Sequence, residues 1–453
     1  MSDFPEEVFR AYDIRGLVDE QITQGFARAL GRSFGARISA MGGKRCLVGY
    51  DARHSGPTLS QALAEGLAEQ GLEVAQIGAV ASPILYWAAH RDQGHGIMVT
   101  GSHNPAPYNG FKMVLGGASI HGATVSALRE QMIDPPPALD GGRIIEEDWT
   151  GPYQADLLQR LNPLGRPIKV VVDAGNGMGG LALPLLTGMG AEVIGIHCEA
   201  DGDFPNHHPD PTVEANLVEL QACVRREQAA AGIAFDGDVD RIGVVDEFGT
   251  VIWGDLLTAL FAKDILKQHP GATIIGEVKC SSALYDGIEA LGGQAIMWKA
   301  GHSLIKGKMK ETGALLAGEM SGHLFFADRY DGFDDAIYAA GRLLELLDRD
   351  ARPLSAQIAD FPRLASSPEI RRPVADEATK FALVEAATAY FRARGPVIDI
   401  DGVRVPFDGG WGLVRASNTQ SILVLRFEAE TRERLQQIQE EVEAVLDQLE
   451  RRL

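Results

Sequence analysis

The sequence is poor in cysteine. Its 453 residues contain four, at Cys46, Cys198, Cys223 and Cys280, and no Cys-x-x-Cys pair. Four dispersed thiols argue against a disulfide framework and against a thiolate zinc site. They are typical of a chain that folds in a reducing compartment.

Basic residues are also scarce, since 42 Lys and Arg stand against 62 Asp and Glu and give a formal net charge of −20. This charge argues against nucleic acids and anionic membranes as general partners. No stretch approaches the ~18 apolar residues of a membrane span. The acidic first seven residues lack the apolar segment of a signal peptide. We therefore expect a cytoplasmic protein that binds neither nucleic acid nor membrane.

The length predicts three or four domains. Short apolar runs alternate with helix-period segments through most of the chain, which indicates α/β units. The last ~90 residues instead show an α+β pattern, with strands expected at 397–400, 403–406 and 421–427 before a long terminal helix. We place the domains at residues 1–149, 150–250, 251–363 and 364–453.

Three carboxylates occupy alternate positions of one short loop, Asp236, Asp238 and Asp240, directly after a buried apolar run. A tight loop of this kind can converge on a hard cation such as Mg²⁺, which prefers oxygen ligands. A solvated acidic turn and an EF-hand remain alternatives, but Arg241 stands where the EF-hand loop requires glycine. A haloacid-dehalogenase-type site is a third alternative, and it would leave Ser102 without a role.

Ser102 follows a predicted strand at residues 96–100, and open α/β sheets bind ligands at such strand ends. Its hydroxyl could carry a phosphoryl group, although serine is also an ordinary turn residue. A Ser-His hydrolase with His103 is disfavoured, because the sequence has no G-x-S-x-G elbow. Lys112, ten residues later, could supply positive charge or transfer a proton beside the serine.

Two further loops fit a sugar phosphate. Glu319, Ser321 and His323 alternate, so in an extended segment all three would point one way and could bracket sugar hydroxyls. The segment 415–419 combines a guanidinium fork with hydroxyls, which suits a phosphate that is not transferred. Its candidate ligands are Arg415, Ser417, Asn418 and Thr419.

Together these four loops resemble the signature set of the α-D-phosphohexomutase superfamily, and the resemblance runs through essentially the whole chain. The segments Thr-Gly-Ser-His-Asn-Pro at 100–105 and Gly-Glu-Met-Ser-Gly-His at 318–323 are most similar to the bacterial phosphomannomutase/phosphoglucomutase group. Supporting segments lie at 9–16, 109–112 and 301–302 and at Lys279.

The resemblance implies an α/β fold of four domains around a central cleft, three related α/β domains with mixed sheets plus a C-terminal α+β domain. It also implies a phosphoserine at Ser102 and Mg²⁺ bound by that phosphoserine and the three aspartates. Tyr12 and Lys279 join the substrate-binding residues on the same ground.

The function expected is interconversion of hexose 1-phosphate and hexose 6-phosphate, of mannose or glucose, through a hexose 1,6-bisphosphate. Arg15, Lys112 and Arg241 would assist as cations, and a monomer would suffice. The candidates for the general acid/base are Lys112 and His323, followed by His302, and the sequence does not choose between them. Phosphoglucosamine mutase, a metal-dependent sugar phosphatase and a catalytically silent sugar-phosphate sensor remain as alternatives.

Overall fold

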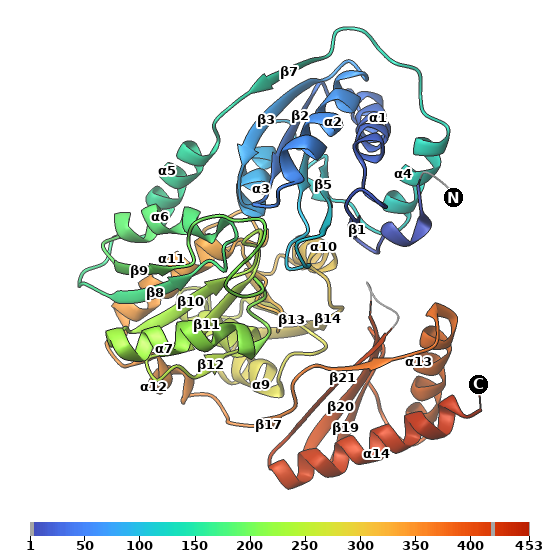
Figure 1. The fold of residues 1–453 in the computed structure, drawn as a ribbon. Coiled ribbons are helices and arrows are strands. Elements are labelled where there is room, and N and C mark those ends of the chain that lie inside the picture. Colours follow the sequence, from blue (N-terminus) through green and yellow to red (C-terminus); the bar gives the residue numbers. More distant parts are fainter. Residues whose placement is uncertain (1–3, 418–421, 453) are drawn as a thin grey trace.

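The computed structural model describes residues 4–417 and 422–452 (Figure 1). Four sheets follow one another along the chain, each with its own helices. The first three contain both parallel and antiparallel neighbours, which confirms the mixed sheets that the family resemblance implied.

The first sheet has the order β1-β5-β4-β2-β3-β7, with β6 paired to β5. Its inner strands β2 and β4 run parallel, whereas β5 is antiparallel to both β4 and β1. The strands are β1 (Ile14–Leu17), β2 (Arg45–Tyr50), β3 (Glu73–Ala79), β4 (Gly96–Val99), β5 (Tyr108–Leu115), β6 (Ala118–Ser119) and β7 (Arg143–Glu146). The helices are α1 (Gln24–Ala40), α2 (Gly56–Ala68), α3 (Ser82–Arg91) and α4 (Ala123–Ile133).

The second sheet has the order β12-β11-β10-β8-β9 and includes β8 (Lys169–Asp173), β9 (Glu192–Ile196), β10 (Ala231–Phe235), β11 (Ile242–Asp246) and β12 (Val251–Ile252). Because β12 pairs with β11, this sheet extends two residues past the boundary expected after residue 250. Its helices are α5 (Thr150–Arg160), α6 (Leu183–Gly188) and α7 (Val218–Glu227). Residues Glu214–Leu217 form a 3-10 turn directly before α7.

The third sheet has the order β14-β13-β15-β16, formed by β13 (Thr273–Glu277), β14 (Gln294–Trp298), β15 (Leu316–Gly318) and β16 (Leu324–Phe326). It is accompanied by α8 (Gly254–Gln268), α9 (Ser282–Ala290), α10 (His302–Thr312), α11 (Ala336–Arg349) and α12 (Leu354–Ile358). One continuous hydrophobic cluster draws buried side chains from all three α/β domains, among them Trp87, Tyr153 and Tyr338. These domains therefore share a core.

The fourth sheet is antiparallel and consists of β17 (Ala365–Ser366), β18 (Ile370–Pro373), β19 (Val403–Phe407), β20 (Gly410–Ala416) and β21 (Ile422–Ala429). Helices α13 (Glu377–Arg392) and α14 (Arg432–Glu450) pack on it and enclose a separate core. The strand expected at 397–400 is absent, and that segment makes one isolated bridge, between Ile398 and Arg404. It ends in a turn at Gly402, whose φ of 75° does not belong to a strand.

No helix in the described part of the chain is both long enough and apolar enough to cross a membrane.

Candidate active site

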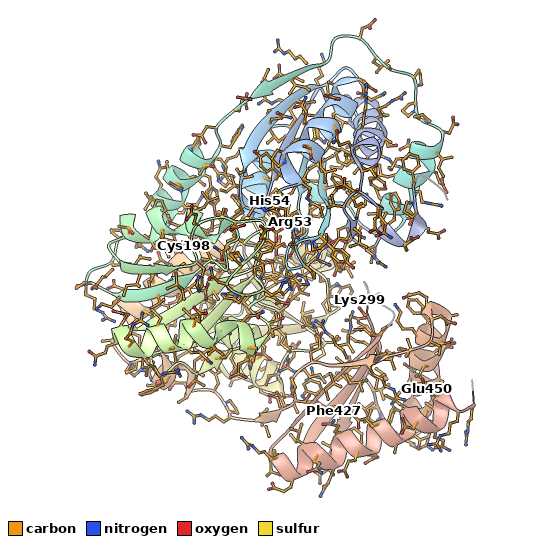
Figure 2. All side chains as sticks on the ribbon, viewed as in Figure 1. Arg53, His54, Cys198, Lys299, Phe427 and Glu450 are labelled. Carbon is orange, nitrogen blue, oxygen red and sulfur yellow. The ribbon has the colours of Figure 1, made fainter. Side chains whose placement is uncertain are left out.

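A cavity of about 1060 Å³ lies where loops of all four domains meet. The first domain contributes Tyr12, Arg15, His103 and Lys112, and the second contributes Arg241. The third and fourth contribute Lys279, His302, Glu319, Ser321, His323, Glu369, Arg415 and Ser417. Figure 2 shows the side chains crowding the junction of the first two domains, close to the labelled Arg53. The cavity thus brings together residues as distant in sequence as Tyr12 and Ser417.

Ser102 lies in the loop after β4, as its place behind a buried apolar run predicted. Its hydroxyl donates to Asp236 Oδ2 at 2.8 Å, and its Oγ lies 3.1 Å from Nδ1 of His103. The residue is buried and has a φ of 47°, in the left-handed region that non-glycine residues rarely adopt. Strained residues of this kind cluster at functional sites.

The carboxylates of Asp236, Asp238 and Asp240 are fully buried, and one oxygen of each lies within 4.8 Å of the others. Their loop connects strand β10 to strand β11, so the EF-hand alternative, which needs flanking helices, is excluded. Lys112 Nζ donates to Asp238 Oδ2 at 2.6 Å and also to Asp240 Oδ2. Ser82, at the start of α3, donates to Asp238 as well.

This oxygen cluster fits a hard cation. Asp238 Oδ1 is buried and accepts no hydrogen bond from the described residues, whereas Asp240 Oδ1 contacts His323 Nε2 at 3.3 Å. Burial and repulsion from Asp240 and Asp238 raise the pKa of Asp236 well above its ordinary value. Although burial opposes its charge, the Lys112 and His323 cations hold the pKa of Asp240 well below its usual range. A divalent cation would neutralise these crowded carboxylates and take their oxygens as ligands.

Glu319, Ser321 and His323 do converge, but not from an extended segment as the alternation suggested. Residues 319–322 form a tight turn between β15 and β16, in which Glu319 N–H donates to His323 C=O at 3.0 Å. Gly322 permits this turn with a φ of 92°. His323 Nδ1 therefore reaches both Glu319 Oε2, at 2.8 Å, and Ser321 Oγ, at 3.1 Å.

Two histidines stack in the cavity, and their pKa values are shifted in opposite directions. The rings of His302 and His323 are 5.6 Å apart. Burial opposes the charge of His323, but Asp240 (3.3 Å from Nε2) and Glu319 raise its pKa to about 9. Burial, assisted by Lys306, lowers the pKa of His302. At neutral pH the pair therefore offers one cationic and one neutral imidazole.

Further cations of the cavity contact neighbouring polar side chains. Arg15 donates to Asp13 Oδ2 at 2.7 Å and to Asn104 Oδ1 at 2.5 Å. Arg241 Nε lies 3.3 Å from His323 Nε2, and the ring of Tyr12 packs edge-on against His302.

Lys279 also lines the cavity, and its Nζ donates to Glu369 Oε2 at 3.2 Å. Arg415, on β20, donates to Asp401 Oδ2 at 3.1 Å, and Ser417 lines the cavity beside it. The predicted ligands Asn418 and Thr419 lie outside the described residues.

Sequence reasoning overlooked several residues that hold this site. Arg53 and Asp51 form hydrogen bonds to the Ser102 loop, and Asp401 and Glu369 pair with Arg415 and Lys279 of the cavity. The one available signal was the Asp-x-Arg that follows the apolar run 46–50, since polar residues at a strand end often serve a site.

Comparison with known protein families matches the chain along most of its length. The families are described as Phosphoglucomutase/phosphomannomutase alpha/beta/alpha domain I (residues 6–135), domain II (153–249), domain III (253–364) and C-terminal domain (369–445). The phosphomannomutase/phosphoglucomutase of Pseudomonas aeruginosa is 48% identical over 437 residues, which cover 96% of this chain and 94% of that protein.

Solved structures of related proteins share the fold of this chain. A phosphoglucomutase/phosphomannomutase family protein from Burkholderia thailandensis superposes with a TM-score of 0.92 at 42% identity, over 98% of both chains. The N-acetylphosphoglucosamine mutase of Aspergillus fumigatus, in complex with glucose 1,6-bisphosphate, shares the fold with a TM-score of 0.63 at 14% identity, over 98% of this chain and 96% of that one.

Proposed function

The chain belongs to the phosphoglucomutase/phosphomannomutase family of the α-D-phosphohexomutase superfamily, and on that premise we propose that it interconverts the 1-phosphate and the 6-phosphate of a hexose, mannose or glucose. The reaction runs through a phosphoserine at Ser102 and a hexose 1,6-bisphosphate. The enzyme is an isomerase that works by phosphoryl transfer, and it acts as a monomer, since one chain supplies every group the reaction requires.

The observation that carries this proposal is the contact between Ser102 Oγ and Asp236 Oδ2, 2.8 Å, at the edge of three buried carboxylates. A nucleophilic hydroxyl beside a cation site is the arrangement that phosphoryl transfer requires. Asp236, Asp238, Asp240 and the phosphorylated Ser102 would hold Mg²⁺. When bound, that ion would neutralise charge on the transferring phosphoryl group.

In the forward half-reaction, the bond between phosphorus and Ser102 Oγ breaks and a bond to the free sugar hydroxyl oxygen forms. In this step the sugar hydroxyl loses its proton and the departing Ser102 Oγ gains one; when the other phosphate is transferred back to Ser102, the serine hydroxyl loses its proton and the departing sugar oxygen gains one. His302, with its lowered pKa, suits the acceptor, and His323, with its raised pKa, suits the donor. Lys112 is the third candidate, but it is tied to Asp238 and Asp240. Arg15 and Arg241 add positive charge near the transferring group.

The phosphate that is not transferred needs a site of its own in the cavity. Lys279, Arg415 and Ser417 line the cavity and suit this phosphate. We propose the same role for Asn418 and Thr419. Glu319 and Ser321 also line the cavity and suit the sugar hydroxyls. The bisphosphate must turn over between half-reactions, so each phosphate visits both ends of the cavity.

The test follows mannose 1-phosphate, glucose 1-phosphate and glucosamine 1-phosphate by ³¹P NMR, with Mg²⁺ and a trace of glucose 1,6-bisphosphate. Wild-type protein should form the 6-phosphates, and Ser102→Ala should not. A Ser102→Ala rate above roughly a tenth of wild type would contradict the mechanism, because a covalent step is worth far more than tenfold. Ser39→Ala, on α1, is the matched control and should keep full activity.

The same spectra separate the competing functions. Turnover of the mannose and glucose phosphates supports the proposal, and their rates give the sugar preference. Turnover confined to the glucosamine phosphate would assign the protein to the phosphoglucosamine branch. Release of inorganic phosphate without 6-phosphate would identify a phosphatase.

A further inference from the structure

We propose that Arg53 is a positioning residue for phosphoryl transfer, because its buried guanidinium fixes the loop that presents Ser102. The inference rests on the proposed function of Ser102 as the phosphoryl carrier. Arg53 follows β2 and lies where the first domain meets the second (Figure 2). It does not line the cavity, so it acts through the loop and not on the substrate.

The guanidinium is 1% exposed and donates to four carbonyl groups within residues 102–108. Nη1 donates to Pro105 C=O at 2.7 Å and to Tyr108 C=O at 2.9 Å. Nη2 donates to Ser102 C=O at 2.9 Å and to Asn104 C=O at 2.5 Å. The planar fork of arginine can span these acceptors at once, whereas the ammonium of lysine is a point charge on a flexible stem.

Asp51 completes the support from the other side. Its Oδ2 accepts from Arg53 Nε at 3.2 Å, from Thr100 Oγ1 at 2.7 Å and from Gly101 N–H at 3.2 Å. A side chain at residue 101 would collide with the guanidinium, since a Cβ there would lie 2.5 Å from Arg53 Cζ. Glycine at 101 therefore lets the loop close over Arg53.

The second domain also contacts the Arg53 guanidinium and the Ser102 peptide. The ring of Phe204 lies 5.1 Å from Arg53 Cζ, in a cation–π contact. A Cβ on Gly237, in the aspartate loop, would lie 2.5 Å from Ser102 C=O. The peptide of Ser102 is therefore held between the guanidinium and the aspartate loop, and this fixes the distance between Ser102 Oγ and Asp236.

Two consequences bear on catalysis. Ser102 has an unfavourable φ of 47°, which persists only when the surroundings enforce it. In addition, four carbonyl oxygens that accept from Arg53 cannot turn toward the anionic transferring group, which they would repel. Loss of the fork should therefore impair the transfer step more than the binding of hexose phosphate.

The test compares Arg53→Lys with wild type and with Arg342→Lys. Arg342 is a matched control, because it is equally buried and ion-paired, on α11. We expect Arg53→Lys to lower kcat about 100-fold with KM changed less than about threefold, since a displacement of about 1 Å costs rates of that size. Intact mass after incubation with glucose 1,6-bisphosphate should show slowed phosphorylation of Ser102. Arg342→Lys should lower the melting temperature and leave kcat unchanged.

Arg53→Ala supplies a second measurement, in which millimolar guanidinium should restore part of kcat by occupying the vacated position. If Arg53→Lys keeps kcat within about threefold of wild type, or loses activity only in proportion to unfolded protein, Arg53 is merely structural and the inference fails. If the wild type itself does not phosphorylate Ser102, the proposed function fails instead.

Discussion

At the scale of single residues, Lys112 supplies positive charge to the buried carboxylates of the site. Its Nζ contacts Asp238 and Asp240, and all three side chains are buried. Although burial opposes its charge, these two carboxylates raise the pKa of Lys112 well above its ordinary value. The lysine is thus an internal counter-charge, placed by the pairing of Lys112 with Met98 on the strand that leads to Ser102.

We predict that Lys112→Met destabilises the metal-free protein by about 3–5 kcal/mol, because removing one partner leaves buried charges uncompensated. Mg²⁺ should return more stability to this variant than to wild type, since a ligand that binds only the folded state stabilises it. The measurement is the first urea-unfolding transition in EDTA and in millimolar Mg²⁺.

Lys263→Met removes a partly exposed pair with Asp360 and is the control for that experiment. It should cost no more than about 1 kcal/mol and show no dependence on Mg²⁺. Equal losses in the two variants, or an equal Mg²⁺ effect in Lys112→Met and wild type, would refute the counter-charge role.

At the scale of elements, three buried strand ends present the chemistry: β4 leads to Ser102, β10 to the aspartates and β15 to Glu319. These strands could be predicted because each is an apolar run followed at once by polar residues. The turn at 319–322 could not, since alternation is equally compatible with a strand and depends here on one left-handed glycine. Arg53 was missed for a related reason: its acceptors lie about 50 residues away, and no local pattern records them.

Gly322 gives an element-scale prediction. A Cβ at this position would lie 2.2 Å from Ile242 C=O, and its φ is 92°. Gly322→Ala should therefore destabilise the protein by at least about 1–3 kcal/mol. It should also lower kcat/KM, because the turn aims Glu319 and His323. Thermal unfolding and steady-state rates check both effects.

The matched substitution is Gly307→Ala, in helix α10, where a Cβ meets open space. Alanine should stabilise that helix by about 0.5–1 kcal/mol and leave the rate unchanged. If both alanine variants behave alike, the backbone conformation of Gly322 does not matter to the site.

At the scale of the whole molecule, the fourth domain is attached differently from the others. The first three share one core, whereas the fourth encloses its own and touches the third through a small cluster of Val278, Trp411 and Leu413 (Figure 1). Arg404 reinforces this contact, donating to Val278 C=O and Cys280 C=O at 2.7 Å. The fourth domain carries Arg415, so under the proposed function its attachment sets how firmly the cavity closes over the bisphosphate intermediate.

We predict that Arg404→Ala loosens this closure without damaging the chemistry. The KM for hexose 1-phosphate should rise about tenfold, equivalent to a loss of about 1.4 kcal/mol in binding. The variant should also need more added glucose 1,6-bisphosphate for full activity, because an open cavity loses the intermediate before it turns over. Small-angle scattering should show a larger radius of gyration. Arg394→Ala, on the exposed end of the same domain, should match wild type in all three measurements. A fall in kcat with unchanged KM and unchanged activator demand would mean that Arg404 shapes the reacting groups, and that closure is controlled elsewhere.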